Sequence, residues 1–304
     1  MPDDLTVQKE LISLSGKRYR FVSDRYYTRP GKFSVTYKGL NEQGGAVLLK
    51  KVIAGFIANE VSMPVRHPVL VPVTDIIRHQ EEVYLVQEFR EGKNLRDWLT
   101  PRVNGKEPEF SEAILQVVDG LGALHAGRWM HGDVKPANII VNSGQTPNVI
   151  SLVDFGKASP IGVRPEGDTS FSLLYSSPEA ILQESDIVGP AADYYALGIS
   201  LYELIERRPA FQHANPELLM HLMLNQPLPA PRYIPDRLFS VIRKMTFRSV
   251  FPRPPHLLPR EERRQLLLAA IDQRYQDATA LRADLEAGFE DFRWPRPWWK
   301  RLLR

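Results

Sequence analysis

The segment 131–138, with the sequence His-Gly-Asp-Val-Lys-Pro-Ala-Asn, holds side chains that are well suited to chemistry. The carboxylate of Asp133 can accept a hydrogen bond from a hydroxyl group, and Lys135 places a cation two residues later. Asn138, and Asp154 in the later Asp-Phe-Gly segment 154–156, carry hard oxygen atoms of the kind that Mg²⁺ prefers. These side chains could orient a hydroxyl, contact a phosphate and hold a metal ion.

Two further motifs follow in the chain, Ser-Pro-Glu at 177–179 and Asp-Tyr-Tyr-Ala-Leu-Gly at 193–198. The order and spacing of all four motifs resembles the eukaryotic-like protein kinase family, in its bacterial Ser/Thr branch, over about Lys17 to Phe289. The resemblance implies an α+β, bilobal protein kinase fold. Its N-lobe is a small antiparallel β-sheet with one helix, and its C-lobe is large and mainly helical. It also implies ATP as phosphate donor, Mg²⁺ or Mn²⁺ as the metal, and a protein as substrate.

The resemblance assigns roles to the catalytic segment. Asp133 would orient the attacking hydroxyl, and Lys135 would reach the transferring phosphate. Asn138 and Asp154 would ligate the metal ions that bridge the phosphates. His131 and Phe155 fall at positions with a structural role in the same motifs.

Lys50 is the candidate that grips the α- and β-phosphates, because segment 47–50 resembles the family's Val-Ala-Ile-Lys strand. Lys51 should face the opposite side, since side chains alternate along a strand. Glu60 is the expected carboxylate partner of Lys50 and belongs to a helix predicted near 53–63. Pro64 limits that helix, which we expect to be short.

The adenine site follows from the same resemblance. Gln87 would be the gatekeeper, and the C=O of Glu88 and N–H of Arg90 would pair with the adenine edge. Ile140 would form the apolar floor, and Asn94 is a further candidate contact with ATP.

The Gly-rich loop that should cover the phosphates is degenerate. Segment 29–34 retains only Gly31, and Ser34 stands where an outer glycine would be. Thr36 and Leu48 replace the usual valine and alanine over the adenine, so we expect a bulkier roof and an effect on ATP affinity.

The activation segment also departs from the pattern. Gly132 stands where many protein kinases carry the arginine that receives a phosphate on this segment. We therefore expect constitutive activity or another form of control, although Thr169, Ser170 and Ser172 could be phosphorylated. Ser172 aligns with the threonine that the family hydrogen-bonds to the catalytic aspartate.

Two structural roles are expected. Glu179 needs a buried partner, since an unpaired buried carboxylate is costly, and the resemblance assigns Arg274. Asp193 would hold the backbone of the catalytic loop.

The elements that must position these residues divide the chain. Residues 15–90 are predicted as a strand-rich N-lobe, 91–290 as a helical C-lobe with a surface insertion at about 249–270, and 291–304 as a basic, Trp-rich tail. Ser111 is expected to be the N-cap of a long helix. Further helices are predicted at Asp193 to Glu206, Pro216 to Leu224 and Ala278 to Phe289.

Composition narrows the function classes. The chain has 304 residues, 39 Lys plus Arg, 36 Asp plus Glu and no Cys. A disulfide scaffold, a Cys-ligated zinc site and a thiol nucleophile are excluded. The net charge of +3 gives no support for a nucleic-acid partner.

We expect no signal peptide and a cytoplasmic location. The tail combines tryptophans with Lys and Arg, which favours membrane contact, or else its tryptophans pack on the helical lobe.

Two other functions remain open from the sequence. One is a pseudokinase or nucleotide-binding scaffold, which the degenerate loop favours and the intact Lys50, Asp133, Asn138 and Asp154 oppose. The other is a small-molecule phosphotransferase of the aminoglycoside-kinase type, which shares a His-Gly-Asp loop. The Lys-Pro pair at 135–136 and the Ser-Pro-Glu motif oppose it.

Overall fold

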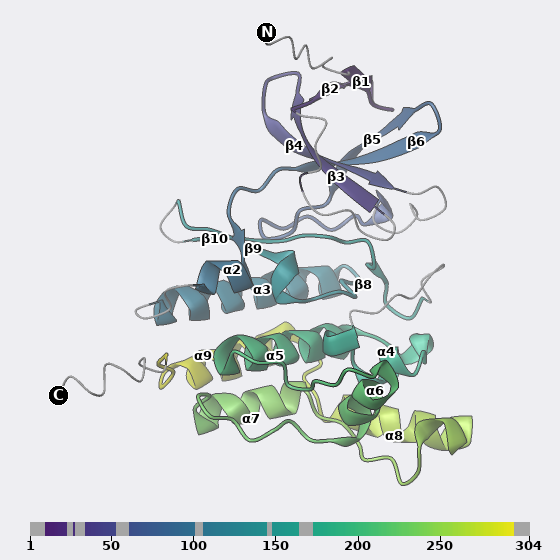
Figure 1. The fold of residues 1–304 in the computed structure, drawn as a ribbon, viewed down its shortest axis with the longest axis vertical. Coiled ribbons are helices and arrows are strands. Elements are labelled where there is room, and N and C mark those ends of the chain that lie inside the picture. Colours follow the sequence, from purple (N-terminus) through teal and green to yellow (C-terminus); the bar gives the residue numbers. More distant parts are fainter. Residues whose placement is uncertain are drawn as a thin grey trace, which may run out of the picture.

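Two lobes, one rich in strands and one helical, make up the computed structural model (Figure 1). It describes residues 10–22, 27, 34–52, 61–100, 106–144, 148–163 and 173–294. The bilobal α+β class expected from the sequence is confirmed. Most of the helix predicted near 53–63 lies outside the described residues.

The N-lobe is an antiparallel sheet with the strand order β1-β2-β3-β4-β6-β5. The strands are β1 (Glu10–Ile12), β2 (Arg18–Phe21), β3 (Ser34–Asn41), β4 (Ala46–Val52), β5 (Val73–His79) and β6 (Glu82–Glu88). The turn between β3 and β4 is held by Asn41, whose Oδ1 accepts hydrogen bonds from the N–H groups of Gln43 and Gly45. This turn sets the register in which Thr36 lies opposite Lys50.

The two edges of this sheet meet. The N–H of Leu14 donates to the carbonyl of Ile76 at 2.8 Å, so the chain after β1 pairs with β5. Asp75 is buried at this junction and accepts hydrogen bonds from Ser15 and from the hydroxyl of Tyr19. The strand β1 was not predicted from the sequence, because it is only three residues long.

The chain crosses between the lobes after β6. It forms β7 (Lys93–Asn94) and α2 (Leu95–Leu99), and the side chain of Asn94 caps this helix by accepting from the N–H of Asp97 at 2.9 Å. Gly92 has a φ of +140°, and a Cβ there would lie 2.4 Å from the carbonyl oxygen of Val141. Only glycine allows the segment that joins the lobes to approach β9 (Ile139–Asn142) this closely.

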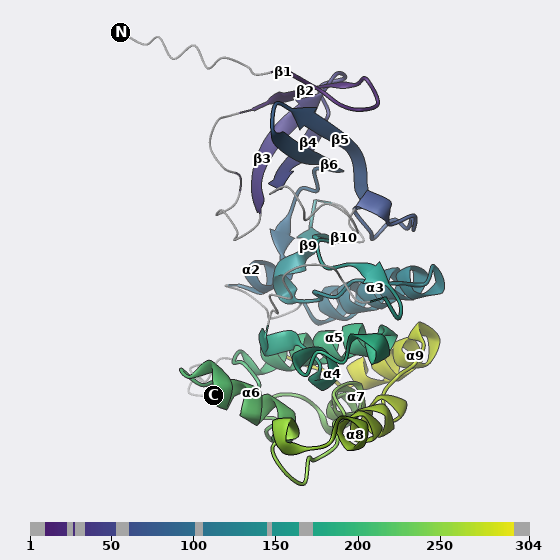
Figure 2. The same ribbon diagram turned by 90° about the vertical axis from the view of Figure 1, so that its right-hand side faces the viewer.

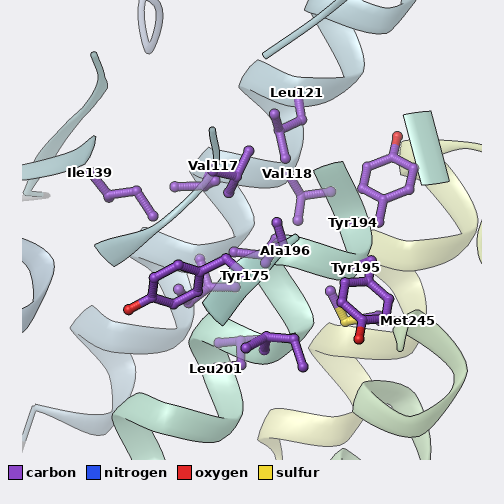
Figure 3. Packing of buried hydrophobic residues seen from close by; sticks show 14 of the residues in the cluster. Val117, Val118, Leu121, Ile139, Tyr175, Tyr194, Tyr195, Ala196, Leu201 and Met245 are labelled. Carbon is purple, nitrogen blue, oxygen red and sulfur yellow. The ribbon is translucent and has the colours of Figure 1, made fainter. Parts of the chain in front are cut away.

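The C-lobe is built around α5, whose residues are almost all buried. Figure 3 shows Val117, Val118 and Leu121 of α3 together with Tyr194, Tyr195, Ala196 and Leu201 of α5 and Met245 of α7 in this core. Figure 2 shows α9 and α8 beside α7 in the lower part of the lobe. The remaining elements are α3 (Glu107–Ala126), β8 (Trp129–Met130), β10 (Val149–Leu152), β11 (Ser159–Pro160), α4 (Pro178–Ile181), α5 (Pro190–Glu206), α6 (Pro216–Asn225), α7 (Asp236–Met245), α8 (Arg260–Asp272) and α9 (Ala278–Phe289).

The predicted N-cap at Ser111 is wrong. The helix α3 begins at Glu107, and the hydroxyl of Ser111 donates to the carbonyl of Pro108 at 2.9 Å inside its first turns. Proline is well tolerated in a first helical turn, where its missing N–H has no partner to lose. Starting there also directs Phe110 into the core.

The segment 249–270, predicted as a surface insertion, is anchored to the C-lobe by a few buried side chains. Phe251, Leu258 and Leu267 are buried in the core of the C-lobe. Arg260 and Arg263 of α8 pair with the buried carboxylate of Glu184, at 3.3 and 2.6 Å. Most residues of the Pro-rich part 252–259 are exposed, so this part lies at the surface as expected, while the buried side chains and the Glu184 pairs anchor the segment to the lobe.

The chain after α9 folds back on α3. Trp294 is buried and its ring lies 5.1 Å from that of Phe110. The rest of the tail, 295–304, lies outside the described residues, so membrane contact stays a prediction. Within the described ranges, no helix is both long and apolar enough to span a membrane.

Candidate active site

The catalytic loop joins β8 to β9 and brings together the residues predicted from segment 131–138. The side chain of Asp133 is only 6% exposed, and its Oδ2 lies 2.6 Å from Nζ of Lys135. The Nδ2 of Asn138 donates to the carbonyl of Asp133 at 2.9 Å. A single 3₁₀ turn over Pro136–Asn138 makes this contact possible, because it folds Asn138 back toward Asp133.

Asp154 reaches the same place from β10, which pairs with β9. The N–H of Val153 donates to the carbonyl of Asn138 at 2.9 Å, which fixes the two segments side by side. The φ of Asp154 is +65°, an uncommon conformation for a residue with a side chain and one that clusters at functional sites.

Lys50 of the N-lobe donates from Nζ to Oδ1 of Asp154 at 2.9 Å. Desolvation by the surrounding protein acts to raise the pKa of Asp154, but the Lys50 ammonium outweighs it and holds that pKa below its ordinary value. Asp154 is therefore a carboxylate at neutral pH, which is the form that binds a cation.

The residues present fit a divalent metal ion. Because the Nδ2 of Asn138 donates to the carbonyl of Asp133, the Oδ1 of Asn138 is the atom left to bind a metal ion. One amide oxygen and the Asp154 carboxylate are hard donors suited to Mg²⁺ or Mn²⁺. In the described ranges no three His, Cys, Asp or Glu side chains gather into a cage of their own. This donor set suits an ion that takes its other ligands from phosphates and water.

His131 supports the loop from beneath as a neutral group. Burial lowers its pKa. Its Nδ1 accepts from the N–H of Asp133 at 3.2 Å, so the proton must be on Nε2, which lies 3.2 Å from the carbonyl of Val153. Its ring packs on Phe155 with centroids 4.8 Å apart. His131 thus links the Asp133 and Asp154 segments.

Asp193 holds the loop from the side of α5. Its carboxylate accepts from the N–H groups of His131 at 2.8 Å and Gly132 at 2.9 Å, and it contacts Nε2 of His125 at 2.8 Å. Burial acts to raise the pKa of Asp193, but the hydrogen bonds and charge of His125 hold it below its ordinary value. The contribution of His125 was not predicted from the sequence.

The residues expected to contact the nucleotide lie on or beside β3, β4, β6 and β9. Lys51 pairs with Glu82 and Lys50 with Asp154, so the two lysines face opposite ways as strand alternation requires. Gln87 lies opposite Leu48 and donates to the carbonyl of Val71 at 3.2 Å.

The residues expected to pair with the adenine edge lie just after β6, and the residue expected to form its floor lies on β9. Glu88 and Arg90 form an ion pair at 2.9 Å beside the predicted adenine edge. Ile140 on β9 lies opposite Asn94 on β7. The side chain of Asn94 is engaged as a helix cap, whereas Ser34 lies at the start of β3 opposite Val52.

Several predicted residues lie outside the described part of the chain: Gly31, Glu60, Thr169, Ser170 and Ser172. The Lys50–Glu60 pair therefore stays a prediction.

The expected pair beneath the Ser-Pro-Glu motif is present. Arg274 Nη1 lies 2.7 Å from Glu179 Oε1, and both side chains are at most 1% exposed. The Nε of Arg274 also donates to the carbonyl of Phe247 at 2.7 Å, so the pair ties α4 to the end of α7 and α8.

Lys157 is a site residue that sequence reasoning missed. Its Nζ lies 3.2 Å from Oδ1 of Asp133, so both oxygens of this carboxylate contact a lysine. The signal was present in the sequence, since Lys157 directly follows the Asp-Phe-Gly segment.

Comparison with known proteins agrees with this geometry. Residues 30–258 match the family described as "Protein kinase domain". The chain is similar to the serine/threonine-protein kinase PknF of Mycobacterium tuberculosis, with 33% identity over 171 residues, which cover 54% of this chain and 36% of that protein. It is similar to the serine/threonine-protein kinase PkaA of Streptomyces coelicolor, with 32% identity over 199 residues, or 64% of this chain and 36% of that protein. The match therefore spans only about a third of the length of these relatives.

Proposed function

Because the chain belongs to the protein kinase family, in its eukaryotic-like Ser/Thr group, we propose that it transfers the γ-phosphoryl group of ATP to a serine or threonine hydroxyl of a protein. The observation that carries this proposal is the convergence of Asp133, Lys135, Asn138, Asp154 and Lys50 at one place between the lobes.

Each side chain has a role that its contacts support. Asp133 accepts the hydrogen bond of the substrate hydroxyl and orients its oxygen toward the γ-phosphorus. Lys135, held 2.6 Å from Asp133, is close enough to contact the transferring phosphate. Asn138 and Asp154 would hold the divalent cation, whose charge stabilises the triphosphate when it is bound.

The proposed reaction is a direct transfer. The acceptor oxygen forms a bond to the γ-phosphorus while the bond to the bridging oxygen breaks and ADP leaves. The hydroxyl proton passes to Asp133 and then to solvent. In this proposal the nucleotide binds between the lobes, which is supported by the positions of Asp133 and Lys50 in different lobes.

The test is the intact mass of the protein after incubation with ATP and Mg²⁺ or Mn²⁺, alone and with a generic protein acceptor. The matched control is Asp133→Ala. Phosphate added by the wild type and lost in the variant supports the proposal, whereas equal addition by both proteins contradicts the role of Asp133.

The main alternative is a nucleotide-binding pseudokinase. Leu48, opposite the gatekeeper Gln87, and Thr36 on the neighbouring strand support it, because both are larger or more polar than the residues usual over adenine. A thermal shift with ATP and Mg²⁺ but no phosphate transfer to any acceptor would favour this alternative.

A further inference from the structure

Asp133 contacts a second lysine through the carboxylate oxygen that Lys135 does not contact. Lys135 contacts Oδ2 at 2.6 Å, and Asn138 also reaches Oδ2, at 3.3 Å. Lys157 contacts the other oxygen, Oδ1, at 3.2 Å. Of the two lysines, Lys157 has the longer contact and the more exposed side chain, 34% against 22%. Its contact is therefore the weaker of the two, and we expect an incoming hydroxyl to displace it rather than the contact of Lys135.

The backbone of Lys157 is fixed on both sides, so this contact does not depend on a loose chain. The N–H of Ala158 donates to the carbonyl of Phe155 at 2.9 Å, and Ser159 pairs with Met130. Gly132 lies directly against it with a φ of +74°, and a Cβ at Gly132 would come within 2.6 Å of the carbonyl oxygen of Lys157. Glycine in the catalytic loop thus permits the approach that places this lysine beside Asp133.

Displacement leaves the ammonium of Lys157 in need of an anion. Among the described residues, Asp133 is the carboxylate that Lys157 contacts. When a serine or threonine hydroxyl takes over Oδ1, Lys157 remains within a few bond lengths of the acceptor because its backbone is held. A carboxylate next to the acceptor in the substrate would restore the lost ion pair.

We propose that Lys157 determines acceptor specificity by favouring serine or threonine residues that are flanked by aspartate or glutamate. The proposal rests on the proposed function, since it concerns the acceptor bound at the same carboxylate. Its distinctive consequence is an attraction for acidic flanks that belongs to a single side chain. A purely structural role for Lys157 would change the binding of acidic and neutral peptides alike.

The test compares two synthetic peptides that differ only in the residues flanking one serine, Asp-Ser-Asp in one and the isosteric Asn-Ser-Asn in the other. Their affinities are measured by fluorescence anisotropy with Mg²⁺ and a non-hydrolysable ATP analogue. The proteins are the wild type, Lys157→Met, Lys157→Arg and the control Lys17→Met, which removes the same charge from an exposed turn in the N-lobe.

We expect the wild type to bind the acidic peptide about fivefold more tightly, as a partly exposed ion pair allows. Lys157→Met should reduce this ratio to about one, Lys157→Arg should restore it, and Lys17→Met should leave it unchanged. Equal binding of both peptides by the wild type, no binding of either peptide, or a ratio that survives in Lys157→Met would overturn the proposal.

Because the readout is binding, its failure is separable from that of the proposed function. A Lys157-dependent preference without any phosphate transfer would refute the kinase activity alone. Phosphate transfer to both peptides without that preference would refute the specificity role alone.

Discussion

Lys50 of the N-lobe and Asp154 of the C-lobe form an ion pair at 2.9 Å, and this contact joins the two halves of the site. The pair holds Asp154, the proposed metal ligand, in its charged form, because the Lys50 ammonium lowers the pKa of this carboxyl. A substitution of Lys50 should therefore affect both its proposed contact with the phosphates and the pKa of Asp154.

Lys50→Met should lower kcat/KM for ATP by about a hundredfold, because a preorganised charge at the phosphates is lost. The measurement is steady-state phosphorylation of a protein acceptor. Lys51→Met is the matched control, since Lys51 pairs with Glu82 on the opposite face of β4, and it should remain near the wild-type rate. The reverse ranking of the two variants would assign the phosphate role to Lys51.

Arg274→Met should destabilise the protein by about 3–5 kcal/mol, because it leaves the buried Glu179 carboxylate without its partner. Glu179 Oε2 and Arg274 Nη2 have no hydrogen-bond partner among the described residues, so the pair does not fully offset its own desolvation. The double variant Glu179→Leu/Arg274→Met should therefore be less destabilised than Arg274→Met. Urea unfolding measures the free energy of unfolding of the wild type, Arg274→Met and the double variant. A double variant that is less stable than Arg274→Met would contradict this account.

Gly92→Ala should lower both stability and ATP affinity. Its Cβ would lie 2.4 Å from the Val141 carbonyl at a φ of +140°, so the segment joining the lobes must move away from β9, which carries the proposed floor of the nucleotide site. Gly162→Ala is the control, because Gly162 also has a positive φ of +80° but no atom of the described residues lies within 4 Å of the added carbon. Thermal shifts with and without ATP should show a loss of nucleotide stabilisation for Gly92→Ala only.

Stability should fall as the pH drops below about 6.5, the ordinary pKa of histidine, because burial lowers the pKa of His131. In that window the unfolded chain binds a proton that the folded protein excludes, so acid favours unfolding, by up to about 1.4 kcal/mol per pH unit. His131→Gln keeps a donor and an acceptor but does not titrate. Its free energy of unfolding should change less than that of the wild type between pH 7.5 and about 5.5, whereas parallel curves would show that other groups dominate.

The part of the site that could be predicted from the sequence consists of residues that lie close together in the chain. Segment 131–138, Asp154 and the Ser-Pro-Glu motif could be recognised because their residue types follow one another closely in the chain. The α+β class could also be predicted, since strand-forming runs give way to helical spacing after Gly92. The helix Ala278–Phe289 was predicted with the bounds that the structure shows.

The tertiary structure decided the contacts between distant segments. Lys157 reaches Asp133, and His125 reaches Asp193, only because β11 pairs with β8 and α3 packs on α5. The buried junction around Asp75, the start of α3 at Glu107 and the packing of 249–270 also depend on neighbours far away in the chain. Residue type and spacing report the local backbone and the chemistry that a side chain can do. Which charges meet is set by the burial of apolar surface, which is not directional and so selects partners only once the whole core is assembled.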